Sequence, residues 1–363
     1  MARELPNLQG PVCPLPLQHH DQILMGHGSG GKMSHDLITR IFLPPFDNPS
    51  LRAGDDAGLV KIELQGESNK GVMTGHIAIS TDSHVVWPLF FPGGDIGRLS
   101  VCGTVNDVAM MGAKPLFLTA GFVLEEGLDV NTLKAVVASM QTAAAEACVM
   151  IVAGDTKVVQ KGKADGIYIN TTGVGLIPPG IEISGSRAQP GDVVVLSGPI
   201  GEHGIAVLEA RHELGFTANI KSDIAPLNHL VRAMLETSNQ IHVMRDPTRG
   251  GLATSLNEIA RQSSVSIIID EKRIPINPAV SMACELLGFD PLYIANEGKL
   301  IAIIAHEDAE RVLHAMHSTR YGEEAVIIGE VRTEPKNRVL MRTTIGSTRI
   351  VDIPSGEILP RIC

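Results

Sequence analysis

Stretches typical of strands alternate with stretches typical of helices along most of the chain, and this alternation constrains its fold more than any other feature. The runs HIAISTDSHVV, GIYINTTGVGLI and DVVVLSG predict strands, whereas GDIGRLSVCGTVNDVAMMGAKP predicts a helix that ends near Gly112 and Pro115. A length of 363 residues suggests about two domains. The turn-forming PPG at 178–180 divides two halves of similar size, which predicts an α+β or α/β protein of two domains.

Further elements follow from the same patterns. DVNTLKAVVASMQTAAAEA predicts a helix that is capped by Asp129. Its expected apolar stripe consists of Val130, Leu133, Val137, Met140 and Ala144. CVMIVAG, which Cys148 opens, predicts a buried strand. In the second half, IGEHGIAVLEARHEL, PTRGGLATSLNEIARQS and EDAERVLHAMHS predict helices, and VSIIID, LIAIIA and EAVIIGEV predict strands.

The predicted organisation has four segments. Residues 1–21 form a loose, Pro-rich extension that we expect to be disordered, residues 22–177 form the first domain, residues 178–345 form the second, and residues 346–363 form a tail. The tail carries a thiol at its last position, Cys363. Because a carboxylate beside a thiol disfavours the thiolate, this cysteine is either an inert end or a group on which another site acts.

Composition excludes several classes of function. A net charge of −10 argues against a nucleic-acid partner, and no apolar run is long enough to span a bilayer. The N-terminal stretch lacks the apolar core of a signal peptide. Five cysteines without a CxxC pair fit a reducing compartment, so we expect a cytoplasmic protein without a zinc site.

The first candidate site is the glycine segment GHGSGGK, from Gly26 to Lys32. Glycines let backbone N–H groups approach a phosphate, and the lysine adds positive charge. The pattern is not a P-loop, because Met33 stands where that motif needs Ser or Thr and no buried strand precedes it. The segment is therefore interpreted as a flexible flap or as a plain linker.

The second candidate site is a set of carboxylates in small-residue contexts. A buried carboxylate needs a partner or a metal, and Mg²⁺ takes few carboxylates together with phosphate oxygens and water. Four such segments therefore predict a site for Mg²⁺ and a polyphosphate, although each carboxylate alone has a structural alternative. The residues are Asp55, Asp56, Asp82, Asp107 and Asp155.

Cations and a histidine accompany these carboxylates. Lys157 is placed to reach a transferring phosphoryl group. In MRDPTRGGLA, Asp246 and Thr248 are expected to cap a helix, and neighbouring arginines pair with anions; an ordinary capped helix is the alternative. His84, directly after the STDS turn, is either a base or a surface residue.

The ordered motifs resemble a known family. GHGSGGK, DDA, STDSHVV, VCGTVNDVAMMGA, GDTKVV, INTTGVG, MRDPTRGGLA and the final PRIC are together similar to the hydrogenase maturation factor HypE, over residues 22–363. That family belongs to the superfamily of aminoimidazole-ribonucleotide synthetase, selenophosphate synthetase and thiamine-monophosphate kinase. The resemblance implies a PurM-like fold, in which an N-terminal mixed-sheet dimerisation domain precedes a C-terminal α/β domain and a flexible tail. It also implies a homodimer with nucleotide sites near the interface.

The resemblance further implies an activity. The partner HypF would place a carbamoyl group on the Cys363 sulfur. This chain would then use ATP and Mg²⁺ to dehydrate the S-carbamoyl group to S-cyanide. The cyano group would pass to iron on the HypC–HypD pair as a ligand of a [NiFe]-hydrogenase centre.

Roles for individual residues follow from the same resemblance. Cys363 would carry the substrate, Lys157 would stabilise charge on the activated carbamoyl group, and Glu297 would deprotonate its nitrogen, with His84 as a second candidate base. The five carboxylates named above would hold Mg²⁺ and the ATP phosphates. The nucleotide would further contact Gly28, Gly30, Gly31, Lys32, Asn106, Asp107 and Thr156.

Three rival functions are weaker. A selenophosphate synthetase would carry a reactive Cys or selenocysteine in the glycine segment, where this chain has Ser29. A non-catalytic carrier of the tail thiol would need no phosphate site. A metal chaperone would need clustered ligands.

Overall fold

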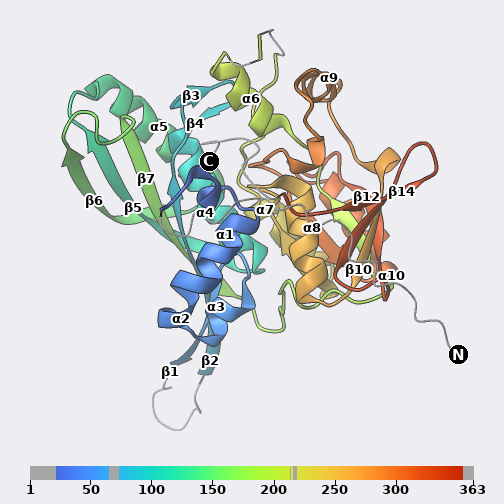
Figure 1. Ribbon diagram of the computed structural model, residues 1–363. Coiled ribbons are helices and arrows are strands. Elements are labelled where there is room, and N and C mark those ends of the chain that lie inside the picture. The colour runs from blue at the N-terminus through green and yellow to red at the C-terminus, as the bar shows by residue number, and fades with distance from the viewer. Residues whose placement is uncertain (1–21, 65–72, 213, 216–218, 355–363) are drawn as a thin grey trace, which may run out of the picture.

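The computed structural model describes residues 22–64, 73–212, 214–215 and 219–354, which form two α+β units side by side (Figure 1). The predicted extension at 1–21 and residues 355–363 of the predicted tail lie outside the described residues. Among the described helices, none has the length and apolar character that a membrane crossing requires.

A helical segment precedes the first sheet. A 3₁₀ turn, Met25–Gly28, leads into helix α1 (Lys32–Leu37), which continues through a π-helical turn (Ile38–Phe42) into α2 (Leu43–Phe46). Helix α3 (Pro49–Ala53) follows, with the Asn48 side chain accepting a hydrogen bond from the Leu51 N–H as its N-cap. This segment brings the glycines and Asp55 against the second unit.

The first unit is built on a five-stranded sheet in the order β1-β2-β7-β5-β6. Neighbouring strands are antiparallel except β5 and β6, so the sheet is mixed, as expected. Helix α4 (Ile96–Met110) packs on one face and α5 (Val130–Ala147) packs against α4. A short hairpin, β3 (Phe90–Phe91) and β4 (Gly94–Asp95), precedes α4. The sheet strands are β1 (Gly58–Leu64), β2 (Met73–His84), β5 (Lys114–Glu125), β6 (Met150–Val159) and β7 (Ile167–Ile177).

The predicted stripe of α5 is confirmed in part. Met140 and Ala144 are buried and Leu133 packs against the core, but Val130 and Val137 are exposed, because the buried face is rotated toward Val136, Ala143 and Ala147. Two expectations for the next strand were wrong. The strand predicted as buried, β6, is the edge of the sheet and its side chains are exposed. Cys148 does not open that strand; it ends α5 with a φ of 55°. The Asp129 cap is confirmed, since its side chain accepts a hydrogen bond from the Thr132 N–H.

The second unit is built on a seven-stranded sheet in the order β14-β13-β10-β12-β8-β11-β9. Its strands are β8 (Val193–Leu196), β9 (Ile241–Arg245), β10 (Ser266–Asp270), β11 (Ile301–Ile304), β12 (Val326–Arg332), β13 (Arg338–Arg342) and β14 (Thr348–Val351). The last strand pairs with β13, so the sheet extends past the tail boundary predicted at 346.

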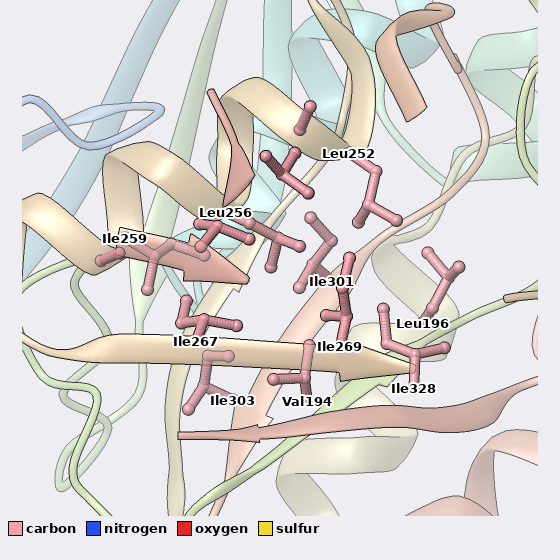
Figure 2. Packing of buried hydrophobic residues seen from close by; sticks show 14 of the residues in the cluster. Val194, Leu196, Leu252, Leu256, Ile259, Ile267, Ile269, Ile301, Ile303 and Ile328 are labelled. Atoms are coloured by element: carbon pink, nitrogen blue, oxygen red, sulfur yellow. The ribbon is translucent and has the colours of Figure 1, made fainter. Parts of the chain in front are cut away.

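Helices cover both faces of this second sheet. Helix α8 (Gly251–Gln262) packs its Leu252, Leu256 and Ile259 on one face, where Figure 2 shows them against Val194, Leu196 and residues of neighbouring strands. Helices α7 (Asn228–Thr237) and α10 (His306–His317) cover the other face, against Val193 and Val195. All four residues of β8 are therefore buried, as in a sheet covered on both sides. Helices α6 (Glu202–Ala210) and α9 (Pro278–Leu287) pack beside each other.

A polar cluster joins the two units. Arg98 of α4 donates from Nε to the Ile224 carbonyl (3.1 Å) and from Nη1 to Glu146 Oε2 (2.8 Å). Glu146, at the end of α5, also accepts a hydrogen bond from the Tyr321 hydroxyl and pairs with Arg320 at 3.1 Å. Because Arg98 and Glu146 are both largely buried, this cluster fixes the orientation of one unit against the other.

We expect Arg98→Met to lower the free energy of unfolding by about 2 kcal/mol, because it removes the donor from a carboxylate and from a backbone carbonyl. Urea denaturation followed by circular dichroism measures the change. Arg311→Met is the matched control, because Arg311 is exposed and pairs with Asp308 within one helix; its effect should stay below about 0.5 kcal/mol. Equal effects of the two substitutions would contradict the role of the cluster.

Candidate active site

The glycine segment lies against the second unit and against the start of the tail. Arg249 donates from Nη1 to the Gly28 carbonyl at 3.3 Å, and a Cβ on Gly30 would stand 3.0 Å from the Arg249 Cβ. The Lys32 N–H donates to the Pro354 carbonyl at 3.3 Å. A Cβ on Gly31 would come within 2.7 Å of the same carbonyl oxygen, so this contact requires glycine. Residue 354 is thus anchored beside the segment.

A cavity of about 250 Å³ opens beneath this segment. Its walls come from two segments far apart in the sequence: the glycine segment on one side, and the end of β9 with the start of α8 on the other. The polar residues that line it are His27, Ser34, Asp56, Arg245, Asp246, Thr248, Arg249, Thr254, Ser255 and Glu258.

Arg245 balances the first pair of predicted carboxylates. Its Nη1 donates to Asp56 Oδ1 at 2.7 Å, its Nη2 lies 3.8 Å from Asp55 Oδ1, and Nη2 also donates to the Gly54 carbonyl at 2.6 Å. Asp55 in addition accepts a hydrogen bond from the Gly185 N–H at 2.8 Å. The other oxygen of Asp56 is buried without a hydrogen-bond partner. Asp55 is therefore structurally satisfied, whereas Asp56 keeps one oxygen for a ligand.

Further carboxylates lie close enough to Asp56 to repel one another. Burial raises the pKa of Asp56 to about 6, although Arg245 opposes the shift. Burial and then the charges of Asp246, Asp56 and Asp82 raise the pKa of Asp107 well above its usual value. Asp107 accepts one hydrogen bond, from the Ser80 hydroxyl at 2.6 Å. Burial and then Asp56 likewise raise the pKa of Asp246. Such a concentration of buried carboxylates favours the binding of a metal cation together with an anionic ligand of that cation.

Glu297 faces the same group from the second unit. Its side chain is 3% exposed and its Oε1 has no hydrogen-bond partner. Burial, followed by the charges of Asp246 and Asp82, raises its pKa well above the usual value for a glutamate. Asn106 of α4 donates to the Ala225 carbonyl at 3.0 Å and accepts from the Leu227 N–H at 2.8 Å. Asn106 thus joins the two units beside the site.

His84 is buried rather than on a surface turn, because β2 runs through residue 84. Its Nε2 lies 3.6 Å from Asp82 Oδ2 and 3.4 Å from the Thr171 hydroxyl, while Nδ1 is buried without a partner. Burial lowers its pKa, and Arg249 lowers it further. A neutral imidazole with a lowered pKa is a weak base.

Asp155, Thr156 and Lys157 lie apart from this group. They belong to the edge strand β6, and β7 and β5 separate them from Asp82 on β2, a gap of about 14 Å at the usual strand spacing. In the strand register, Asp155 lies opposite Gly121, which lies opposite Asn170, whereas Asp82 lies opposite the buried Thr171. Because Asn170 and Thr171 are consecutive residues of β7, Asp155 and Asp82 face opposite sides of the sheet. Lys157 Nζ pairs with Asp155 at 2.6 Å, and both side chains are 68% exposed.

The site fits Mg²⁺ only together with phosphate. In the described ranges, no three His, Cys, Asp or Glu side chains gather closely enough to hold a metal ion by themselves. Mg²⁺ retains water and is commonly bound by one or two carboxylates plus phosphate oxygens. The unpartnered oxygen of Asp56 and the repelled carboxylate of Asp107 match that requirement.

Sequence reasoning missed two acidic residues. Asp246 was expected to cap a helix, yet α8 begins at Gly251 after Gly250 and receives no side-chain cap, so the Asp246 carboxylate is left to the cavity. Asp223 accepts a hydrogen bond from the Glu297 N–H at 3.0 Å. The signal for Asp246 was its position directly after the apolar strand IHVMR; Asp223, in an irregular segment, gave none.

We expect Arg245→Lys to lower the free energy of unfolding by about 1–3 kcal/mol. A single ammonium group cannot reproduce the separate contacts that the two terminal nitrogens make with Asp56 and Gly54. The midpoint of urea denaturation reports the loss. Arg261→Lys, at an exposed position of helix α8, serves as control and should change it little. An unchanged midpoint for Arg245→Lys would show that the fork geometry is unimportant.

The chain matches two family models. Residues 54–177 match the N-terminal domain of AIR synthase related proteins, and residues 189–342 match the C-terminal domain. Among curated relatives, the carbamoyl dehydratase HypE of Cupriavidus necator is 54% identical over 342 residues, which cover 94% of this chain and 95% of the relative.

Solved structures agree with these matches. A HypE structure in a HypE–HypF complex is 49% identical with a TM-score of 0.81, covering 88% of this chain and 99% of that chain. A HypE structure in complex with ATP is 48% identical with a TM-score of 0.77, covering 94% of this chain and 100% of that chain. The expected PurM-like fold of two domains is thereby confirmed. The chain belongs to the HypE family of hydrogenase maturation proteins, whose curated members include carbamoyl dehydratases.

Proposed function

We propose that the chain dehydrates an S-carbamoyl group on its own Cys363 to an S-cyanide, with ATP as the activating reagent and Mg²⁺ as its counterion. The observation that carries the proposal is the contact between the glycine segment and Pro354. Cys363 is the ninth residue after Pro354, and a segment of that length spans at most about 30 Å when extended. The thiol can therefore reach the carboxylate cavity beside which Pro354 is anchored.

The chemistry requires an activated oxygen. The carbamoyl oxygen attacks the γ-phosphorus of ATP, ADP leaves, and the nitrogen loses one proton to give an imidate phosphate. A base then removes the second nitrogen proton, the C–O bond breaks, and inorganic phosphate departs as the C≡N bond forms. The carbamoyl oxygen leaves as part of inorganic phosphate, and both nitrogen protons are released. The net change is the loss of one water from the carbamoyl group as ATP is converted to ADP and phosphate. A dry, charge-matched pocket favours both steps.

Residues of the cavity fit these steps. Asp56 and Asp107, with Asp82 and Asp55 nearby, would hold Mg²⁺ and the phosphates, and the metal would neutralise charge on the transferring phosphoryl group. Gly28, Gly30 and Gly31 would cover the phosphates with backbone N–H groups, and Lys32 would add positive charge. We favour Glu297 over His84 as the base, because burial strengthens a carboxylate as a base but weakens an imidazole.

The position of Asp155 and Lys157 supports a homodimer. Strand β6 is an edge that exposes Met150, Val152 and Val158, and an apolar edge of this kind pairs readily with a second chain. A second copy that covers this edge would bring its own Asp155, Thr156 and Lys157 toward the cavity. Lys157 would then stabilise the phosphoryl group of the partner's site.

We further propose HypF as the carbamoyl donor and HypC–HypD as the acceptor of the cyano group, in the cytoplasm. A relative is described in complex with HypF, and another in complex with ATP, which supports the donor and the nucleotide. The acceptor is implied by the resemblance of the sequence motifs to the HypE family.

The first test is the intact mass of the C-terminal peptide. Protein carbamoylated by HypF should lose one water at Cys363 when Mg²⁺–ATP is added, and should keep its mass with ADP. Cys363→Ser should accept no stable carbamoyl group and should show no loss. A tail that stays carbamoylated in the presence of Mg²⁺–ATP would refute the proposed activity.

The second test asks which chain supplies Lys157. Lys157→Ala and Glu297→Gln homodimers should each lose at least about 100-fold in dehydration rate, since each lacks a group that acts in the transition state. Co-expressed heterodimers, purified through two different tags, should regain about half of the wild-type rate, because one of their two sites contains both intact residues. Heterodimers as inactive as the parents would place both residues in the same chain's site.

A further inference from the structure

A second group of buried charges lies behind Glu297 and takes no part in the chemistry proposed above. The Lys299 Nζ lies 3.6 Å from Glu202 Oε2 and 3.5 Å from Asp223 Oδ2. The side chains of Lys299 and Asp223 are 13% and 1% exposed. Burying such ions carries a desolvation cost, and a well-packed apolar cluster is often as stable or more stable. Stability therefore does not explain why charged side chains occupy this place.

Asp223 connects this group to Glu297. One of its oxygens faces Lys299, and the other accepts a hydrogen bond from the Glu297 N–H at 3.0 Å. The Glu297 carbonyl in turn accepts from the Ala225 N–H at 3.4 Å. The backbone of Glu297 is thus held from both sides by the segment that carries Asp223.

The backbones of the two segments touch at Gly298. A Cβ at this residue would stand 1.8 Å from the Asp223 carbonyl oxygen, which no side chain permits. Because the contact is direct, a shift of Asp223 moves Glu297 as well. A displacement of about 1 Å at a catalytic group can cost about 100-fold in rate.

We infer that Lys299 is a positioning residue, which neutralises Asp223 and Glu202 and thereby holds the loop that presents Glu297 to the carbamoyl nitrogen. The inference rests on the role proposed for Glu297. Without the ammonium group, two carboxylates would face each other in a buried space. Water would enter, or Asp223 would turn away and lose the hydrogen bond that it accepts from the Glu297 N–H, and either change would loosen the segment that holds Glu297.

The test compares Lys299→Met, Lys299→Arg and the surface control Lys336→Met in the full-length protein, carbamoylated by HypF. Single-turnover loss of water at Cys363 is followed by mass at several concentrations of Mg²⁺–ATP. Lys299→Met should slow the dehydration step about 30- to 100-fold and leave half-saturation by ATP within about twofold. Lys299→Arg should restore most of the rate, and Lys336→Met should match the wild type.

A double-substitution cycle adds a second readout, and its Asp223→Asn variant can be measured even if Lys299→Met folds poorly. Asp223→Asn removes the charge that Lys299 balances while it retains an oxygen for the Glu297 N–H. If Lys299 acts through Asp223, Lys299→Met combined with Asp223→Asn should be no slower than Lys299→Met alone. Additive losses, a normal rate for Lys299→Met, or no rescue by Lys299→Arg would overturn the inference.

Glu297→Gln, measured in parallel, separates the positioning role of Lys299 from the role of Glu297 as the base. A slow Glu297→Gln with a normal Lys299→Met would overturn only the positioning role. A normal rate for Glu297→Gln would overturn the proposed base and, with it, the inference about Lys299.

Discussion

The structure depends on confining negative charge between its two units. Asp56, Asp107, Asp246 and Glu297 come from a loop, a helix, the end of a strand and a second loop. Burial raises the pKa of each of them, and repulsion from neighbouring carboxylates adds to the shift. Arg245 compensates one side of this group with a forked contact to Asp56 and Gly54. Arg249 offsets only part of the charge near Glu297, and one oxygen of that carboxylate has no hydrogen-bond partner, so a bound metal ion would supply further positive charge.

The two sheets serve this site in different ways. The second sheet is covered by helices on both faces, so its central strands β8 and β11 are apolar and buried throughout and provide a rigid base for Arg245, Asp246 and the loop of Glu297. The first sheet is covered by helices on one face and ends in the exposed edge β6. In the proposed homodimer, this edge and its exposed apolar side chains would be the surface that a second copy covers.

Much of the fold followed from pattern alone. The helices at α4, α8 and α10 and the strands at β8, β10, β11 and β12 were predicted, because long apolar periodicities and Gly or Pro stop signals mark them clearly. The errors concerned which neighbours cover an element, and not whether it is a helix or a strand. The orientation of α5 and the exposure of β6 depend on which neighbours cover them, and a run such as CVMIVAG is equally apolar in the centre of a sheet and at an edge that awaits a partner.

The sequence by itself determined which residue types are present and where the chain turns: the glycines before Lys32, the carboxylates in small-residue contexts, and the family to which their order belongs. Only the tertiary structure decided which of them meet. It joined Asp246 and Asp223 to the site, buried His84, and placed Lys157 three strands from Asp82. The physical reason is that local periodicity fixes the direction of a side chain within its own element. The dielectric, the neighbours and the unpaired charge of that side chain are set by contacts between segments far apart in the chain.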